Sequence, residues 1–343
     1  MIKNISIAYI LLIAFLSIFA YCFIPDKSSN ANQMHLSIHS ESPGFEVDLL
    51  LIDNSTNYEQ NLFEKLFFGD KNPPLEIPLQ QYVFIDDIFY YNEYGNLSDS
   101  YDNSLIVESP REFKSNSVIN RVFWLGTDKF GRDVLSRLVI GARISFFIGF
   151  VSVLISLIIG LFLGGLSGYY SGNIDRLVMW VINVTWSIPT LLLVIAITLA
   201  LGKGLWQVFI AVGLTMWVDV ARVVRGQVMI IKERQYITAA RVLGFSDLRI
   251  LTVHILPNII SPLIIISAAN FAASILIESG LSFLGLGAQP PVASWGSIIK
   301  DHYNYIILGK PMLALIPGIC IMSLVMAFML LGNKLRDNLD VRN

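Results

Sequence analysis

Side chains that could do chemistry are sparse in this chain of 343 residues, and three segments hold the most informative charges. The stretch 238–258 reads TAARVLGFSDLRILTVHILPN, and it carries two arginines, an aspartate and a histidine between two long apolar runs. Charges of both signs alternate along residues 128–137, where Asp133 and Arg137 have the i,i+4 spacing of a helical ion pair. Glu278 lies inside an apolar run, where an ionisable group usually faces a cavity or a partner.

The sequence lacks the motifs of nucleotide, metal and hydrolytic sites. It has no GxxxxGK(S/T) phosphate loop and no HExxH pair, and its four histidines are scattered. It also has no paired-carboxylate or Ser/His/Asp signature. We therefore predict that the chain is not an enzyme and has no catalytic residues, metal site or bound cofactor. Any ATP that drives its action must bind another polypeptide.

The composition predicts an integral membrane protein. The chain is 54% hydrophobic and 15% charged, whereas a soluble domain is usually about one quarter charged. Six apolar runs reach the ~20 residues that cross a bilayer core, namely residues 5–24, 145–168, 177–201, 205–225, 259–286 and 311–332. The first run is long for a signal peptide and lacks a small-residue cleavage site, so we favour an uncleaved span. The fold class predicted is an all-α polytopic membrane protein with six transmembrane helices.

Glycine and proline give expectations for two of these runs. Gly160, Gly164, Gly165 and Gly168 have nearly helical spacing, and small residues let membrane helices approach closely. Equally, glycine is simply common in membrane helices. Pro189, inside the third run, predicts a kink.

Residues 25–120 differ from the rest of the chain. They hold 16 acidic and 5 basic side chains, whereas the remainder is basic and apolar. Segments 45–52 and 81–91 are rich in strand-forming residues and are separated by Pro, Asn, Gly and Ser. We predict a small α/β or β insert after the first span, which occupies residues 1–24.

Basic residues predict the orientation in the membrane, because Lys and Arg are enriched in cytoplasmic loops. They gather before and within the loop 226–257 and in the C-terminal tail, as Arg222, Arg225, Lys232, Arg234, Arg241, Arg249, Lys334, Arg336 and Arg342. With six spans, both termini and this loop share one side. We therefore place them in the cytoplasm and the acidic insert outside.

The loop that contains the stretch 238–258 reads as two short helices joined at a glycine. Gly244 can adopt the positive φ that ends a helix, and Ser246 can cap a second helix whose first turn begins at Asp247. We expect Pro257 to end that helix. The small and apolar surface of the pair would either bind a partner protein or pack on the chain's own spans, and physical reasoning leaves both open.

The segment QYITAARVLGFSDLRILTVHILPN closely resembles the EAA loop of binding-protein-dependent ABC transporter permeases. Ala239, Ala240, Gly244 and the Ile255–Pro257 tripeptide match that pattern, whereas Thr238 stands where the family usually has glutamate. The resemblance implies a coupling helix that docks in a groove of an ATP-hydrolysing subunit. The ATPase-coupling residues it implies are Thr238, Ala239, Ala240, Gly244, Ser246, Asp247, Arg249, Leu256 and Pro257.

Two further segments resemble dipeptide, oligopeptide and nickel permeases, in particular the C-type member of the permease pair. The first, GTDKFGRDVLSRLVIGARIS, covers residues 126–145, and the second, ESGLSFLGLGAQPPVASWG, covers residues 278–296. The motif residues of the first are Gly126, Thr127, Asp128, Gly131, Arg132, Asp133 and Arg137, whose charges would otherwise lie on a solvated interfacial helix. In the second, Glu278 and Trp295 are candidates for the pathway or outer gate. Interfacial or packing use is slightly favoured for Glu278, and a membrane-interface anchor is the alternative for Trp295.

The resemblance implies a type I ABC importer permease core over residues 121–343, with the coupling loop at about 226–258. It implies a second permease as heterodimer partner, two ATP-binding subunits that carry ATP and Mg, and an extracytoplasmic substrate-binding protein. The chain would also contact membrane lipid and would bind no nucleic acid. The resemblance places it in a bacterial inner membrane. Peptides are the expected substrate and nickel is the alternative. A self-sufficient secondary transporter or channel, or a membrane-anchored binding protein, remain competing hypotheses.

Overall fold

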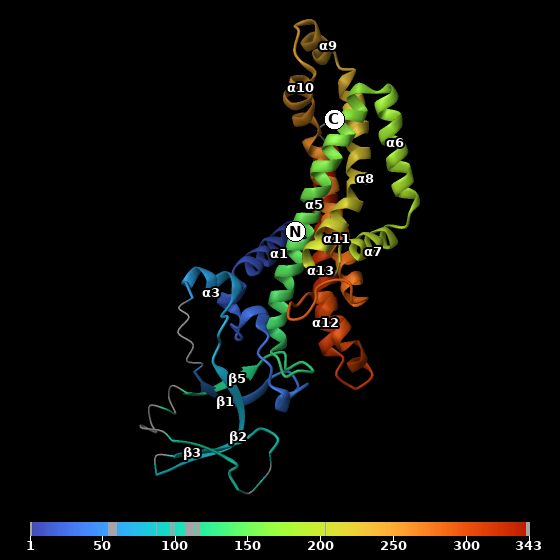
Figure 1. The fold of residues 1–343 in the computed structure, drawn as a ribbon. Helices are drawn as coiled ribbons and strands as arrows, with labels where there is room; N and C mark the ends of the chain where they lie inside the picture. The colour runs from blue at the N-terminus through green and yellow to red at the C-terminus, as the bar shows by residue number, and fades with distance from the viewer. Residues whose placement is uncertain are drawn as a thin grey trace.

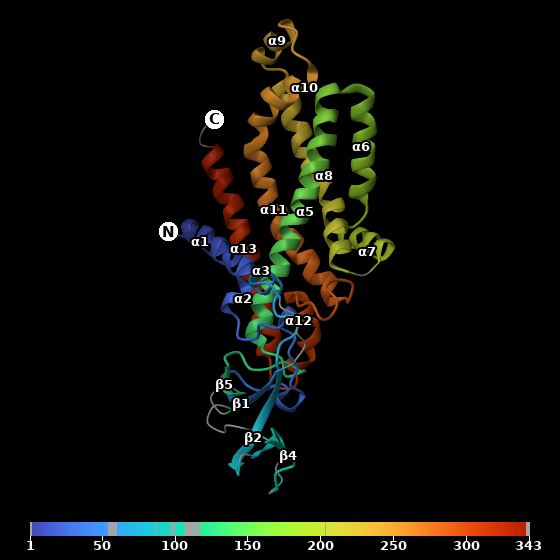
Figure 2. The same cartoon turned by 60° about the vertical axis from the view of Figure 1, so that its left-hand side comes forward.

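The computed structural model describes residues 2–53, 60–86, 88–96, 98, 100–106, 113, 117–202 and 204–340. Long helices form a bundle, and a small β-sheet lies beyond one end of it (Figure 1). The helix α9 (Gln235–Val242) lies at the opposite end of the molecule in both views (Figure 2). The two regions singled out by their charge therefore lie far apart.

Four helical runs of the described residues are long and apolar enough to cross a membrane. They are α5 (Val134–Tyr170), α8 (Leu205–Lys232), the run Asp247–Phe283 that ends in α11 (Ile260–Phe283), and Met312–Asp337 within α13 (Met312–Asp340). The first apolar run forms the shorter α1 (Ile2–Ile18) and the single turn α2 (Ala20–Phe23). The structure thus bears out a helical polytopic membrane protein, and the count of six spans stays a prediction.

The run expected at 177–201 is a bent pair of helices instead of one kinked span. It forms α6 (Gly172–Ser187) and α7 (Thr190–Leu201), which meet at 96°. Pro189 lies at the break with an extended backbone, because proline lacks the N–H that would continue the helix. The proline therefore does more than kink the run.

The helices α5 and α8 pack closely because α5 presents glycines to α8. A Cβ placed on Gly160 would lie 2.5 Å from the Val220 side chain, and one on Gly164 would lie 2.5 Å from the carbonyl oxygen of Ala221. Gly168 meets the next turn of α8 in the same way. Gly165 faces no described atom within 4 Å. Close helix approach explains three of the four glycines.

The residues between α2 and α5 form a five-stranded antiparallel sheet with strand order β4-β3-β2-β1-β5. The strands are β1 (Phe45–Ile52), β2 (Leu75–Ile85), β3 (Ile88–Glu93), β4 (Asn103–Ile106) and β5 (Val118–Phe123). One face buries Leu50, Leu79 and Phe89, and the other buries Leu49 and Phe123. A short helix, α3 (Leu62–Phe68), lies between β1 and β2 in the sequence and packs beside α2 in space.

Short helical turns complete the connections. They are η1 (Ser29–Ala31), η2 (Leu36–Ile38), α10 (Asp247–Arg249), η3 (Ile250–Ile255), η4 (Leu256–Ile259), α12 (Trp295–His302) and η5 (Tyr303–Ile306). A core made by α1, α5, α11, α12 and α13 surrounds Trp295 and Phe271. This core holds the bundle together at the end that faces the sheet.

Candidate functional site

The loop 226–258 folds into a hairpin-like extension whose turn is built at Gly244. The helix α9 ends there with φ +78°. The N–H of Gly244 donates to the carbonyl of Arg241 at 2.9 Å, and the N–H of Phe245 donates to the carbonyl of Ala240 at 3.1 Å. These two bonds make a Schellman cap, in which the left-handed position favours glycine. The elbow predicted at Gly244 is therefore present.

The second helix differs from the expectation in two ways. Ser246 occupies the N-cap position, yet within the described part of the chain its side chain makes no capping hydrogen bond. Pro257 does not end the helix, because α10 continues through a π turn in η3 and a 3₁₀ turn in η4 into α11. The π and 3₁₀ turns change the backbone hydrogen-bonding pattern around Pro257, so the helix continues although proline has no N–H to donate. Consequently the loop is continuous with a span, as a rigid arm would be.

The inner face of the loop packs on the chain's own helices. Ile237 and Ala240 of α9 and Ile250 and Ile255 of η3 are buried in one cluster with Val224 and its neighbours on α8. Asp247 is fixed separately, since the hydroxyl of Tyr169 at the end of α5 donates to its Oδ1 at 2.7 Å. The packing alternative raised from the sequence therefore applies to this face.

The outer face of the loop is apolar and exposed. Val242, Leu243 and Leu248 are 83%, 73% and 72% exposed. Residues predicted to couple to an ATPase are also exposed, among them Thr238, Ala239, Gly244, Ser246 and Pro257. Three large aliphatic side chains at the tip of a loop are unusual for a surface bathed in water. This face offers a docking surface, as the other alternative requires.

Two arginines border that surface and stack on aromatic rings. The Arg249 guanidinium lies 4.4 Å from the ring centre of Phe245, and that of Arg241 lies 5.4 Å from Tyr169. Such contacts orient a cation without neutralising it. The docking surface therefore combines apolar side chains with positive charge.

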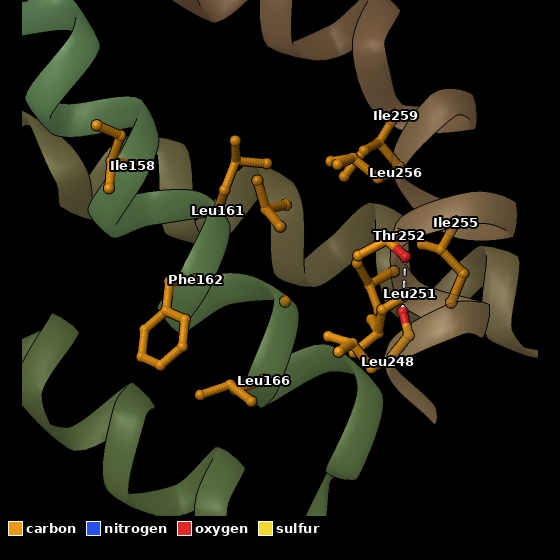
Figure 3. A pocket seen from close by; sticks show the side chains of 13 residues that line it. Ile158, Leu161, Phe162, Leu166, Leu248, Leu251, Thr252, Ile255, Leu256 and Ile259 are labelled. Carbon is orange, nitrogen blue, oxygen red and sulfur yellow. Dashed lines mark hydrogen bonds between the residues drawn. The ribbon is translucent and has the colours of Figure 1, made fainter. Parts of the chain in front are cut away.

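An apolar groove separates this loop from α5 (Figure 3). Its volume is about 320 Å³, and its walls include Leu161 and Leu166 on α5 and Leu248, Leu251 and Leu256 on the loop. Figure 3 shows these side chains lying on both sides of the groove. The groove leaves space between the loop and α5, whereas the loop packs directly on α8. Among the described residues, no group of His, Cys, Asp or Glu could hold a metal ion.

The 126–137 motif forms a buried cluster of polar side chains at the start of α5, not a solvated interfacial helix. Asp128, Arg132, Asp133 and Arg137 are 1% to 5% exposed. Nε of Arg132 donates to Asp128 Oδ2 at 2.6 Å, and Nη2 forms an ion-pair contact with the same oxygen at 2.6 Å. Arg137 Nε lies 3.7 Å from that oxygen. Asp133 is the N-cap of α5 and accepts from the Ser136 N–H at 2.9 Å. The predicted Asp133–Arg137 pair is wrong, because capping uses Asp133 and Asp128 takes the arginines.

The glycines and the threonine of the motif fit the chain segment that covers it. Thr127 Oγ1 accepts from the Glu41 N–H at 2.8 Å. Gly126 and Gly131 have φ near +75° and +72°, and a Cβ on Gly131 would lie 1.7 Å from the carbonyl oxygen of His35. No other residue type fits there. Residues 35–42 therefore form part of this site, although they lie within the insert.

Two titratable groups around the motif have shifted pKa values. Burial alone would raise the pKa of Glu76, but hydrogen bonds from His35 and Arg121 outweigh it and hold that pKa below its usual value. Burial lowers the pKa of His302, whose Nδ1 lies 2.8 Å from the Ile298 carbonyl. Nε2 of His302 accepts a hydrogen bond from the Lys129 N–H at 3.4 Å. That nitrogen can accept only when it carries no proton, which agrees with a neutral ring. Both groups tie surrounding elements to the motif loop.

Glu278 and Trp295 lie in the core that joins α11 to α12. Glu278 is fully buried, and its Oε1 accepts from the Ser282 hydroxyl at 2.7 Å, while its Oε2 has no hydrogen-bond partner among the described residues. Trp295 is 1% exposed, and its Nε1 donates to the Leu138 carbonyl at 2.9 Å. A membrane-interface anchor is therefore the wrong interpretation of Trp295. A role for either residue in the pathway or gate stays a prediction.

Sequence reasoning missed two contributors to the loop. Tyr169, assigned to no site, fixes Asp247, and nothing near it in the sequence marks that contact. Val242 is the most exposed apolar residue of the loop. The sequence feature that could have identified it is a valine next to Arg241 in a segment predicted to face water.

A bundle of apolar helices, with a loop that exposes apolar side chains at one end, defines a helical polytopic membrane protein. The family model "Binding-protein-dependent transport system inner membrane component" matches residues 156–342, which is more than half of the chain. The chain belongs to this family. The membership confirms the resemblance to ABC importer permeases, and it makes the protein a membrane component of a transport system.

Curated relatives agree with this assignment. The chain is 41% identical to the glutathione transport system permease protein GsiD of Pectobacterium atrosepticum, over 63% of this chain and 72% of that protein. It is 42% identical to the dipeptide transport system permease protein DppC of Bacillus subtilis, over 63% and 68%. A solved structure of the inward-facing MetNI methionine ABC transporter aligns with 58% of this chain and 95% of its own, at 20% identity and a TM-score of 0.49.

Proposed function

We propose that this chain is the permease subunit of an ATP-driven importer for short peptides, and that ATPase subunits drive it through the loop 226–258. The single observation that carries the coupling role is the exposure of Val242, Leu243 and Leu248 at a loop whose second half, from Asp247, is continuous with α11. A groove in a partner would bury these side chains, at roughly 1.5–3 kcal/mol for each one fully covered. The arm would then transmit the partner's movement along α11.

Short peptides are the proposed substrate class because the relatives named above are permeases for glutathione and dipeptides. These names favour peptides over nickel. Substrate would arrive from an extracytoplasmic binding protein, and a second permease would supply the other half of the path. Thr238 would contribute no charge to the ATPase contact, so Arg241 and Arg249 would be its main electrostatic groups.

The orientation follows from the same proposal. The loop and both termini lie in the cytoplasm of a bacterium, and the sheet lies outside the inner membrane. The ATP and Mg of the transport cycle are bound by the partner ATPases. Closing of the ATPases would move the two arms, and the spans would alternate between inward and outward openings.

Gly244→Asp tests this function. The substitution forces a left-handed φ on a residue with a Cβ and places a carboxylate on the docking face, so we expect the ATPase to be lost from the complex. The measurement is co-purification from the native membrane in mild detergent through a tag on the C-terminal tail. Wild type should bring an ATPase subunit and a second permease.

Gly309→Asp is the matched control. Gly309 also has a positive φ of +79° and is exposed, and a Cβ added there would meet no described atom within 4 Å, but it lies between η5 and α13 at the sheet end. We expect this variant to keep the ATPase. Wild type that purifies alone, or a Gly244→Asp complex that keeps its ATPase and its ATP-dependent uptake, would overturn the coupling role.

A further inference from the structure

The helix α3 exposes an apolar surface that the sheet does not cover. Leu62, Phe63 and Phe68 are 82%, 69% and 62% exposed, and Leu66 is 44% exposed. Leu62, Phe63 and Leu66 lie at i, i+1 and i+4, so they share one face of the helix. Such a concentration of large apolar side chains on seven residues marks an interaction surface.

Contacts at its C-terminal end fix α3 against the ends of the spans. The Ser29 hydroxyl donates to the carbonyl of Phe68 at 3.0 Å, and the Arg143 guanidinium donates to the carbonyl of Phe67. Gly69 packs on the ring of Tyr21, since a Cβ there would lie 2.6 Å from that ring. The helix therefore does not move freely with the sheet.

These contacts place α3 at the level of the membrane boundary. Tyr21 lies near the end of the apolar run 5–24, and Arg143 lies just before the apolar run 145–168. Two separate spans therefore give the same depth for α3. Both views show α3 beside α2, between the bundle and the sheet (Figures 1 and 2).

The first span beside α3 also exposes large apolar side chains. Phe15, Phe19 and Phe23 follow one another along α1 and α2, with ring centres 5.0 Å and 5.9 Å from Phe15, and they are 39% to 55% exposed. On a membrane span, exposed phenylalanines of this kind face lipid tails. Since α3 packs on α2, it lies beside that lipid-facing surface.

Cations border the helix. Lys65 lies one helical turn after Leu62, and its Nζ lies 3.1 Å from Asp70 Oδ2. Lys27 and Lys71 lie on the two chain segments beside α3, and all three lysines are exposed. An apolar face with flanking lysines is the arrangement of a helix that lies in the headgroup region.

We propose that α3 is an interfacial membrane anchor, which lies in the lipid surface and ties the sheet to the bilayer. Leu62, Phe63 and Leu66 enter the boundary between headgroups and acyl chains, and Lys65 stays at the level of lipid phosphates. The sheet is then held at a fixed height above the spans. A lipid surface fits better than a protein groove because α3 packs on α2, beside the exposed phenylalanines of the first span.

The test is the depth of a nitroxide spin label in the complete importer, reconstituted in nanodiscs of phosphatidylcholine and phosphatidylglycerol. The two free cysteines, Cys22 and Cys320, are replaced by serine, and single labels are placed at Leu62→Cys and Phe63→Cys. Ile106→Cys is the control, because Ile106 is 89% exposed on β4 at the far side of the sheet. Collision rates are measured with oxygen, which concentrates in lipid, and with a nickel chelate, which stays in water.

We expect the ratio of oxygen to nickel collisions to be several-fold higher at positions 62 and 63 than at position 106. A ratio at both positions equal to that at 106 would overturn the proposal, because α3 would then lie in water. Low collision rates with both reagents would also overturn it, since a protein subunit would then cover the helix. Retention of the partner subunits by each labelled complex shows that the variants are folded.

Discussion

At the residue scale, Asp128 is the polar centre on which the start of α5 depends. Its Oδ1 accepts the backbone N–H groups of Phe130 and Arg132 at 2.8 and 3.0 Å, and its Oδ2 accepts the Arg132 side chain. Arg137 lies within reach of the same carboxylate. One buried anion thus faces two buried cations, which is tolerable only because its oxygens are fully used.

Asp128→Asn should therefore be strongly destabilising. The amide keeps acceptor capacity but loses the charge, and Arg132 and Arg137 lose the buried carboxylate that lies nearest to both. We expect the free energy of unfolding to fall by roughly 3 kcal/mol or more, measured by denaturant titration in detergent. Asp301→Asn is the control, because Asp301 and Lys129 form a half-buried pair at 3.1 Å whose loss should cost about 1 kcal/mol or less. Equal losses in the two variants would contradict the central role of Asp128.

At the element scale, the contact of α5 with α8 depends on which side of α5 a glycine faces. Gly164 and Gly165 are neighbours in the sequence, but successive residues of a helix point about 100° apart. Gly164 touches the backbone of Ala221, whereas Gly165 lines the groove beside the loop. Substitutions at these two positions can therefore show whether the glycines serve close helix packing or are simply common in membrane helices.

Alanine should be destabilising at position 164 and nearly neutral at position 165. In Gly164→Ala the new methyl group would lie 2.5 Å from the Ala221 carbonyl oxygen, so the helices must separate, at a cost of about 1–3 kcal/mol. Gly165→Ala has open space and should change stability by no more than about 0.5 kcal/mol. Denaturant titration of both variants measures the difference. Two variants of equal stability would show that α5 and α8 do not need this contact.

The same elements show where sequence reasoning succeeds. Gly244 predicted an elbow because its φ is a local property, and glycine spacing predicted close packing without saying which glycines touch. The course of the chain through Pro257 was not predictable, since changes of helical pitch compensate for the proline. Asp133 was assigned to Arg137 from spacing alone. Its role as the N-cap of α5 is local, since its carboxylate accepts the Ser136 N–H three residues later. The part that needed the tertiary fold is the cover over the motif, because residues 35–42 reach it only through tertiary folding.

At the scale of the whole molecule, residues 25–120 divide into two functional parts. The segment 28–42 covers the motif at the start of α5, with backbone bonds such as Ser40 N–H to the Asp128 carbonyl at 2.8 Å. The strands beyond it form their own sheet and cores. The first part belongs to the permease core in physical terms, and only the second part is separable from it.

Excision of residues 46–122 should therefore leave ATPase docking intact. Phe45 and Phe123 are register partners on β1 and β5, so a two-residue Asn-Gly turn can join them. The coupling loop lies at the opposite end of the molecule (Figure 1), and we expect the ATPase to co-purify with this variant as with wild type. Excision of residues 28–122 should instead give little folded protein, because it uncovers Asp128 and both arginines. A monodisperse 46–122 variant without its ATPase would mean that the sheet acts on the loop across the membrane, and the two ends of the molecule could no longer be treated as independent.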